Sequence, residues 1–227
     1  MHKLYPGMRF TASYSGGKDS LLAIYRAVQS GMVLQSLLIT YNTDRQRSWF
    51  HGIPTEVLEE VAAAMGVPVH RICTTGEGYG QAFEEALRRE KEQGAQACVF
   101  GDIDIQGHLE WGSHRCAAAG LEACFPLWQE DRLALTREGI RAGFRPRITV
   151  IDRTRLSEDF LGRLLTEETL EDLQAAGVDV CGENGEYHTF VADGPLFSRA
   201  VPVQFQAPLE LGDYLVLPME MQARGLD

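Results

Sequence analysis

The hexapeptide Ser15-Gly16-Gly17-Lys18-Asp19-Ser20 joins a predicted strand, Arg9 to Tyr14, to a predicted helix that ends at Gly31. Adjacent glycines permit backbone conformations that other residues avoid, and they let an anion approach the main chain without meeting a Cβ atom. Amide groups at the start of a helix point towards such an anion, and the helix dipole favours negative charge there. Lys18 adds a cation, and the two serines add hydroxyl donors. The hexapeptide therefore predicts a phosphate-binding loop.

Two common nucleotide-binding loops do not fit this segment. A Walker loop has the pattern GxxxxGK followed by Ser or Thr, whereas Asp19 follows Lys18 and Ala12 stands where the first glycine should be. The Rossmann pattern GxGxxG is absent as well. Asp19 could contact magnesium, organise the loop or cap the helix. A strand-to-helix turn with an incidental lysine is the plain alternative.

Strands alternate with helices in the first half of the chain. Apolar runs predict strands at Arg9–Tyr14, Val33–Thr40, Val67–Ile72, Ala97–Phe100 and Leu121–Phe125. This alternation predicts a doubly wound α/β fold, with a five-stranded parallel sheet and helices on both faces. Ligands of such sheets bind beyond the carboxyl ends of the strands. The loops to search begin at Ser15, Tyr41, Thr74 and Gly101.

The second half of the chain has a different pattern. Helices are expected at Leu133–Ala142 and at Glu167–Ala176, the latter with Thr166 as N-cap and Gly177 as its end. Strands are expected at Tyr187–Ala192, Leu196–Phe205 and Asp213–Leu217. We therefore expect a smaller C-terminal α+β domain. The boundary falls near Leu127–Asp131 and divides the chain into residues 1–128 and 129–227.

Composition limits the function classes. The chain has 227 residues, a net charge of −11, 44% hydrophobic and 23% charged residues, which is typical of a globular protein. No apolar run approaches the roughly 18 residues of a membrane-spanning helix, and the N-terminus lacks the apolar core of a signal peptide. We therefore expect a cytoplasmic protein that does not bind membranes. The acidic balance also argues against general nucleic-acid binding, which requires cationic surface.

The five cysteines, Cys73, Cys98, Cys116, Cys124 and Cys181, form no CxxC pair. This spacing gives no support to a zinc or thioredoxin-like site. Cys98 and Cys124 lie in apolar segments and are expected to be buried. We expect all five to be reduced and structural.

A second unusual segment reads Cys181-Gly182-Glu183-Asn184-Gly185-Glu186-Tyr187-His188-Thr189-Phe190. Glu183 and Glu186 could bind an amine, an ammonium ion or magnesium, and either could act as a general base. A solvated charged turn is the plain alternative. His188 is predicted on the opposite strand face from Tyr187 and Thr189, where it could shuttle protons or simply occupy a strand edge.

The two segments together resemble a known family. The hexapeptide matches the SGGxDS signature of PP-loop ATP pyrophosphatases, and the second segment is similar to the GE-x-GE-aromatic signature of the diphthine–ammonia ligase family among them. The resemblance covers nearly the whole chain. It also includes Gly101-Asp102-Ile103, Pro126-Leu127-Trp128, Gly143, Leu161-Gly162 and Asp193-Gly194-Pro195-Leu196-Phe197.

The resemblance implies an ATP-dependent ligase that uses Mg²⁺. Such enzymes adenylate the carboxylate of diphthine, a modified histidine of elongation factor 2, and ammonia then displaces AMP after pyrophosphate has left. The implied ATP-binding residues are Ser15, Gly16, Gly17, Lys18, Asp19, Ser20, Gly101 and Asp102. The implied catalytic residues are Lys18, Asp19, Glu183 and Glu186. The implied substrate-binding residues are Asp104, His108, Glu183, Asn184, Glu186, Tyr187 and His188.

The loop after Gly101 gathers polar side chains that fit no standard metal-ligand spacing. Asp102, Asp104, His108 and Glu110 could contact ATP or the substrate, or could be plain loop polarity. We therefore predict no resident metal site there. Asn42, Arg45 and His51 follow the second strand, where this fold would meet the adenosine or the substrate.

Some residues depart from the family pattern. Asn184 and His188 replace a glycine and a glutamate, and the loop after Gly101 lacks the usual tyrosine and arginines. The variant resembles bacterial relatives, and bacteria are not expected to make diphthamide. A bacterial counterpart of diphthine, a cobalamin-related carboxylate and tRNA therefore remain alternative acceptors. A non-catalytic nucleotide-binding module is the alternative outside enzymes. The resemblance is also compatible with a homodimer.

Overall fold

The computed structural model describes residues 4–44, 47–48, 52–74 and 78–222. The chain forms two compact units. The N-terminal unit takes its residues from 1–15, 19–49 and 67–131. The C-terminal unit takes its residues from 16–18, 50–66 and 132–227. Three residues of the predicted phosphate loop, Gly16–Lys18, therefore belong to the C-terminal unit.

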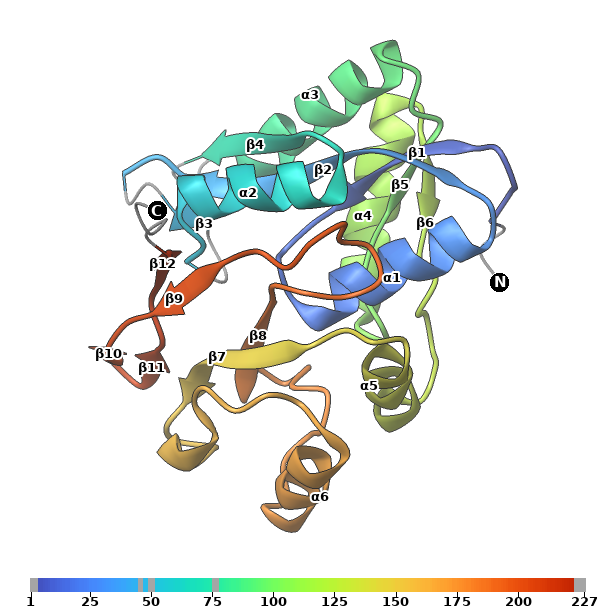
Figure 1. The fold of residues 1–227 in the computed structure, drawn as a ribbon. Coiled ribbons are helices and arrows are strands. Elements are labelled where there is room, and N and C mark those ends of the chain that lie inside the picture. Colours follow the sequence, from blue (N-terminus) through green and yellow to red (C-terminus); the bar gives the residue numbers. More distant parts are fainter. Residues whose placement is uncertain (1–3, 45–46, 49–51, 75–77, 223–227) are drawn as a thin grey trace. The chain divides into compact units, whose positions relative to one another are not determined.

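The N-terminal unit is built on one six-stranded sheet (Figure 1). Five strands are parallel and lie in the order β4-β2-β1-β5-β6. They are β1 (Arg9–Ser13), β2 (Val33–Asn42), β4 (Val69–Thr74), β5 (Ala97–Val99) and β6 (Glu122–Cys124). A two-residue strand, β3 (Arg47–Ser48), pairs antiparallel with the end of β2. The predicted five-stranded parallel sheet is confirmed, and β3 is too short to leave a pattern in the sequence.

Helices cover both faces of this sheet. The chain winds from β1 towards β4 with α1 (Lys18–Gln29), then returns to β5 and β6 with α3 (Tyr79–Glu92) and α4 (Gln106–Ala119). Because parallel crossovers are right-handed, the reversal places α1 on the opposite face from α3 and α4. A buried cluster that includes Phe83, Phe100 and Phe125 fills the α3–α4 side. Among the described residues, no helix is long and apolar enough to cross a membrane.

The thiols of the N-terminal unit are mostly core groups. Cys98, Cys116 and Cys124 are buried and unbridged, and Cys73 is exposed and unbridged. Burial raises the pKa of the Cys124 thiol to about 12 and that of Cys98 well above its ordinary value. These two thiols are therefore neutral at physiological pH. The prediction that Cys98 and Cys124 are buried is confirmed, and the prediction that all five cysteines are reduced stays a prediction.

The C-terminal unit combines helices with small antiparallel sheets. Its four-stranded sheet has the order β10-β11-β7-β8, and β12 pairs with β9. The strands are β7 (Pro146–Asp152), β8 (Tyr187–Val191), β9 (Val203–Phe205), β10 (Leu209–Leu211), β11 (Tyr214–Val216) and β12 (Met219–Met221). The helices are α2 (Thr55–Met65), α5 (Arg132–Arg141) and α6 (Glu167–Ala175), with a short 3₁₀ turn, η1 (Glu158–Phe160). The predicted α+β character is confirmed.

Local signals placed the ends of α6 correctly. The hydroxyl of Thr166 accepts a hydrogen bond from the Thr169 amide at 3.2 Å, which makes Thr166 the N-cap. Gly177 follows the helix with a φ of +72°, the left-handed conformation that glycine adopts without strain.

The strand predicted at Leu196–Phe205 is wrong for most of its length. Only Val203–Phe205 is extended and paired, as β9. The preceding segment packs irregularly along α2, where Ser198 donates from its amide and its hydroxyl to the Ala64 carbonyl. Pro202 has no amide hydrogen to give to a strand ladder. Val201 is buried at 3% exposure, whereas Leu196 and Phe197 are only partly buried, so the apolar residues that suggested a strand lie in an irregular segment.

Candidate active site

The sheet of the N-terminal unit has one point where its strand order reverses. The chain leaves β1 for β2 in one direction and reaches β5 on the other side of β1. Open α/β sheets bind their ligands at this reversal, outside the carboxyl ends of the two strands. The loop after β1 begins with Ser15, and the loop after β5 contains Gly101 and Asp102. Both predicted nucleotide loops therefore follow the strands that flank the reversal.

These two loops touch each other within the N-terminal unit. A Cβ atom on Gly101 would lie 2.7 Å from the Ser20 amide nitrogen and 2.8 Å from the Asp19 carbonyl carbon. Only a glycine allows the second loop to approach the backbone of the first so closely. The Ser20 hydroxyl also accepts from the Ser15 amide at 3.4 Å and from the Ser15 hydroxyl at 3.2 Å. The structure thus brings together four predicted ATP-binding residues, Ser15, Asp19, Ser20 and Gly101.

The polar residues after Gly101 form a smaller group. His108 Nδ1 lies 3.0 Å from an oxygen of Asp102, and both side chains are partly exposed. Asp104 is exposed on the same loop. Trp111, further along α4, stacks on Tyr79 with 5.2 Å between ring centroids. Trp111 therefore packs against the buried cluster of this unit.

The other half of the phosphate loop contacts β8 within the C-terminal unit. Gly16 has a φ of +90°, and its carbonyl accepts from the Val191 amide at 3.0 Å. A Cβ atom on Gly16 would lie 2.3 Å from Ile53 Cδ1 and 3.4 Å from Phe190 Cδ2. Conformation and space both require glycine at this position.

Lys18 connects the phosphate loop to the second motif. Its backbone amide donates to the Thr189 hydroxyl at 3.1 Å, and its ammonium group donates to the Cys181 carbonyl at 2.5 Å. The same ammonium group lies 5.9 Å from the centroid of the Tyr187 ring, within range of a cation–π interaction. The lysine is only 9% exposed. Two segments more than 160 positions apart therefore meet at one lysine.

Asp179 organises the turn that carries the two glutamates. Its carboxylate accepts from the amides of Cys181 at 3.0 Å and Glu183 at 3.1 Å, and from the Arg132 guanidinium at 2.5 Å. Gly182 has a φ of +72°, and a Cβ there would lie 2.8 Å from the Tyr187 carbonyl oxygen. The turn is consequently fixed by a partly buried carboxylate and a glycine rather than being a solvated charged loop.

Glu186 is buried at 6% exposure, and its two carboxylate oxygens differ. Oε1 accepts from the Asn184 side-chain amide at 3.1 Å and from the Asp179 amide at 3.4 Å. Oε2 is buried without a hydrogen-bond partner among the described residues. A buried acceptor without a partner costs free energy unless a ligand or water satisfies it. Oε2 is therefore the atom at which a hydrogen-bond donor from a ligand would be stabilised.

The phenol of Tyr14 is a second buried group of this kind, in the N-terminal unit. Tyr14 ends the segment that leads into Ser15, and its hydroxyl has no partner among the described residues. Burial raises the pKa of this phenol far above its ordinary value, so the hydroxyl stays neutral.

Some of the predicted residues group together, and others are placed separately. Tyr187 and the loop residues Gly16–Lys18 form one group in the C-terminal unit. In the same unit, the Asn184 side chain donates a hydrogen bond to the Glu186 carboxylate. Asp102 and His108 pair in the N-terminal unit. Glu183 and His188 are partly exposed. Arg45 and His51 lie outside the described residues.

The sequence reasoning missed Asp179, Arg132 and Thr189 as contributors. Asp179 stands two residues before the motif, and an aspartate before a Gly-rich turn commonly binds the following amides. That signal was available for Asp179. Arg132 and Thr189 act through contacts that depend on the folded chain.

The groups of the site have complementary chemistry. Main-chain amides, a lysine and serine hydroxyls favour phosphate oxygens. The carboxylates of Asp19 and Glu183 are hard oxygen donors of the kind that Mg²⁺ accepts, and both are partly accessible. Glu186 offers an unsatisfied acceptor for an amine. Taken by their chemistry alone, the donors suit a nucleotide and the Glu186 acceptor suits a nitrogen nucleophile.

Comparisons with known proteins match both halves of the chain. Residues 8–123 match the family model described as the diphthamide synthase N-terminal domain, and residues 131–210 match the one described as the diphthamide synthase C-terminal domain. A Danio rerio protein named diphthine–ammonia ligase is 26% identical over 218 residues, with 86% of each chain covered. The human protein of that name is 28% identical over 222 residues, covering 86% of this chain and 83% of its own.

A solved structure from Methanocaldococcus jannaschii, described as a predicted subunit of tRNA methyltransferase, is also similar. It has a TM-score of 0.45 and 15% identity, with 86% of this chain and 100% of that chain covered. This likeness carries no argument about function.

Proposed function

Because this chain belongs to the diphthamide synthase family, we propose that it is an ATP-dependent amide ligase that adenylates a carboxylate and transfers ammonia to it. The observation that carries the proposal is the double contact of Lys18 with the second motif, through Thr189 and Cys181. A ligase must hold the phosphates and the reacting carboxylate close together. The contacts of Lys18 supply that proximity within one compact unit.

The phosphate loop fits the triphosphate of ATP. Gly16 has the positive φ that shapes this loop, and the loop leads directly into the N-terminus of α1 at Lys18, an end of a helix that favours an anion. The Lys18 ammonium group, now on the Cys181 carbonyl, is a flexible cation that can exchange this acceptor for a phosphate oxygen. The proposed ATP-binding set is completed by Ser15, Gly17, Asp19, Ser20, Gly101 and Asp102.

The proposed reaction has two displacement steps. An oxygen of the acceptor carboxylate attacks the α-phosphorus of ATP, and pyrophosphate leaves, which gives an acyl adenylate. Ammonia then attacks the acyl carbon, AMP leaves, and the nitrogen loses a proton as the amide forms. The Lys18 cation stabilises the charge that develops on the departing pyrophosphate.

Glu186 Oε2 and Glu183 are the proposed partners of the nitrogen. Oε2 is buried and without a partner among the described residues, so an N–H of ammonia or ammonium satisfies it. A carboxylate in that position can also take the proton that the nitrogen loses. Magnesium, when bound, would neutralise phosphate charge, and Asp19 or Glu183 would hold it.

For the acceptor, we propose a carboxylate of the diphthine class, carried by elongation factor 2 or a bacterial counterpart. Relatives across 86% of the chain bear the name diphthine–ammonia ligase. Besides the two glutamates, the proposed contacts of the acceptor are Asp104, His108, Asn184, Tyr187 and His188. Residues 1–128 would serve ATP binding and residues 129–227 acceptor binding, although Gly16–Lys18 group with the C-terminal unit. The proposed location is the cytoplasm.

The direct test is a product analysis. The protein is incubated with ATP, Mg²⁺, ammonium and elongation factor 2 that carries diphthine. We expect AMP and pyrophosphate in equal amounts, with conversion of the carboxylate to an amide. ADP and phosphate as products would contradict the proposed chemistry. ATP binding without any turnover, also with alternative carboxylates, would favour a nucleotide-binding module.

A matched substitution tests the proposed place of the nitrogen. Glu186→Gln keeps an oxygen for Asn184 and Asp179 but replaces Oε2 by an amide nitrogen. We expect the KM for ammonium to rise about tenfold or more, with little change in ATP affinity. An unchanged KM for ammonium would remove Glu186 from this role.

A further inference from the structure

A cavity of about 210 Å³ opens within the C-terminal unit, and none of the proposed ATP-binding, catalytic or acceptor-binding residues lines it. Its walls come from the start of β7, the end of β8, and β9. The charged residues among its lining are Arg145, Arg147 and Asp193, and the aromatic ones are Phe190 and Phe205. Because two guanidinium groups and one carboxylate line the cavity, its lining carries a net positive charge. The protein as a whole has a net charge of −11.

Arg147 is held in place by two contacts of its guanidinium group. Nη1 donates to the Gly162 carbonyl, and the group lies 5.2 Å from the centroid of the Phe205 ring. Its pKa is lowered from the ordinary value by burial and by the neighbouring charge of Arg145. No ion pair with Arg147 occurs among the described residues, although a guanidinium group binds carboxylates and phosphates in a bidentate way.

Arg145 is more exposed and is positioned through its backbone. Its amide donates to the Asp193 carbonyl at 3.2 Å, which fixes the two residues side by side at the cavity. In the part of the chain that the structure describes, the side chains of Arg145 and Asp193 form no ion pair with each other. With two arginines and one aspartate in the lining, one positive charge is left without a balancing carboxylate within the cavity.

The cavity adjoins the phosphate loop through one side chain. Phe190 lines the cavity, and its Cδ2 atom lies 3.4 Å from the position that a Cβ on Gly16 would take. The next residue of β8, Val191, donates to the Gly16 carbonyl at 3.0 Å. All of these residues belong to the C-terminal unit. A molecule in the cavity would thus lie one aromatic ring away from the loop.

We infer that this cavity binds an oxyanion, a carboxylate or a phosphate, on an apolar stem, with Arg145 and Arg147 holding the anion and the Phe190 and Phe205 rings packing the stem. This inference rests on the proposed function in one respect, because it makes the cavity a subsite for a second anionic group of the acceptor. Asp193 opposes the anion, so its charge limits affinity and excludes more heavily charged ligands.

The test is a titration of the full chain followed by NMR chemical shifts. The protein is first saturated with α,β-methylene ATP and Mg²⁺, which fills the phosphate loop. The probes are n-butyrate, n-butyl phosphate and n-butanol, which share one stem and differ in charge. We expect saturable binding of at least one anion, with shifts centred on Phe190 and Phe205. Preference between the two anions identifies the group as carboxylate or phosphate.

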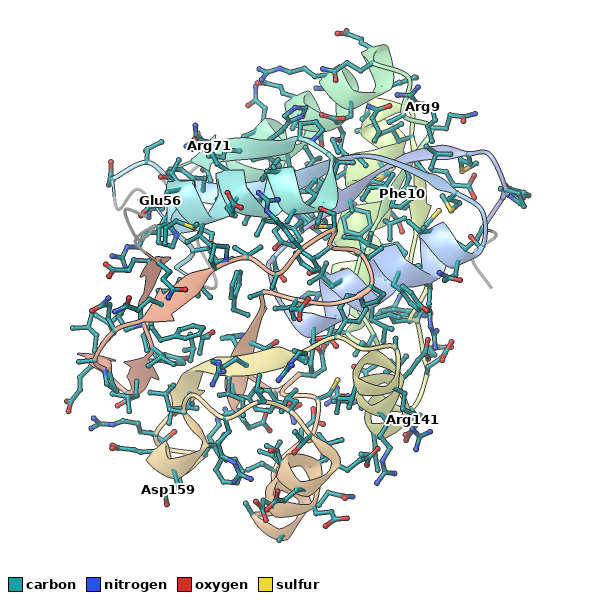
Figure 2. All side chains as sticks on the ribbon, in the orientation of Figure 1. Arg9, Phe10, Glu56, Arg71, Arg141 and Asp159 are labelled. Atoms are coloured by element: carbon teal, nitrogen blue, oxygen red, sulfur yellow. The ribbon has the colours of Figure 1, made fainter. Side chains whose placement is uncertain are left out.

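Four substitutions test the inference with different expected results. Arg145→Gln should lower the affinity for the anion by about tenfold or more. It should not unfold the protein, because Arg145 is exposed. Asp193→Asn should raise the affinity for the same anion, since it removes a negative charge that repels the anion. Arg141→Gln is the matched control: this arginine extends outward from α5 (Figure 2), and its side chain is 74% exposed. Arg147→Lys keeps a charge and a donor for Gly162, and we expect it to retain part of the affinity.

The outcomes separate clearly. Equal binding of n-butanol, an unchanged affinity in Arg145→Gln, or no saturable binding of either anion would overturn the inference. Failure of the ATP analogue to bind would instead count against the proposed ligase. It would not decide the inference about the cavity, because the anion titration can also be carried out without the nucleotide.

Discussion

The phosphate loop and the turn from Asp179 to Glu186 are held in shape by different means. In the loop, position 16 requires a glycine because of its positive φ and the lack of room for a Cβ. Position 101 requires a glycine because its backbone lies so close to the loop backbone. The turn is held by side chains, chiefly the Asp179 carboxylate with its three donors. A backbone-determined site tolerates almost no substitution at its glycines. A site held by side chains loses its shape in proportion to the hydrogen bonds removed.

Lys18 joins both kinds of structure, so its removal should have the largest effect. In Lys18→Ala we expect the rate of AMP formation to fall about 10²–10³-fold, because a cation that stabilises developing charge is lost. Initial rates of AMP release at saturating ATP measure this. Lys91→Ala removes an exposed lysine of α3 and is the control. A decrease below threefold, against about 10²-fold expected, would mean that Lys18 does not act on phosphate.

Gly101→Ala tests the backbone-determined site. A methyl group at 2.7–2.8 Å from the Ser20 and Asp19 main chain forces the two loops apart. We expect ATP affinity to fall about tenfold and unfolding free energy to fall by about 1–3 kcal/mol. Calorimetric titration and chemical denaturation measure the two quantities.

Gly107→Ala provides the contrast within the same region. Nothing lies within 4 Å of a Cβ there, and Gly107 is in the first turn of α4. This substitution should leave ATP affinity unchanged and stabilise the protein by up to about 1 kcal/mol. If both alanine variants behaved alike, close approach at Gly101 would not be what holds the loop.

Asp179→Ala tests the turn that side chains hold. It leaves the Arg132 guanidinium and two amides without their acceptor, and we expect a loss of about 1–3 kcal/mol in unfolding free energy. The Arg132→Gln variant and the double variant complete a thermodynamic cycle. The cycle should show a coupling near 1 kcal/mol for this partly buried pair. Additive effects would show that the two residues stabilise the fold independently.

Tyr14→Phe should have the smallest effect. The phenol is buried without a partner among the described residues, so its removal should be neutral or stabilise the protein by about 1 kcal/mol. Thermal unfolding with and without ATP measures this. A variant that is stable but binds ATP more weakly would show that the Tyr14 hydroxyl contacts the nucleotide.

The sequence predicted the parts of the molecule that depend on spacing along the chain. The strand periodicity, the Ser15–Ser20 loop after β1 and the Thr166 N-cap all follow from local rules. Gly101 was placed at the site because its loop begins at the carboxyl end of a strand, and the structure adds that it touches Ser20.

The remaining features depend on contacts between distant segments. No local pattern links Lys18 to Cys181 or Thr189, and a single polar residue such as Thr189 has no distinctive spacing. The segment before Val203 was misread because its apolar residues resemble a strand in sequence, whereas Ser198 bonds to the end of α2 instead of pairing in a sheet. The Arg145–Arg147 cavity likewise required the folded chain, since Phe190 and Phe205 come from different strands.

The proposed reaction requires an acceptor oxygen to become part of AMP, and an isotope measurement reads this directly. An acceptor with oxygen-18 in its carboxylate is supplied with ATP, Mg²⁺ and ammonium, and the AMP is analysed by mass spectrometry. We predict that each AMP formed carries one labelled oxygen on its phosphate. Unlabelled AMP, or labelled phosphate together with ADP, would contradict adenylation of the carboxylate.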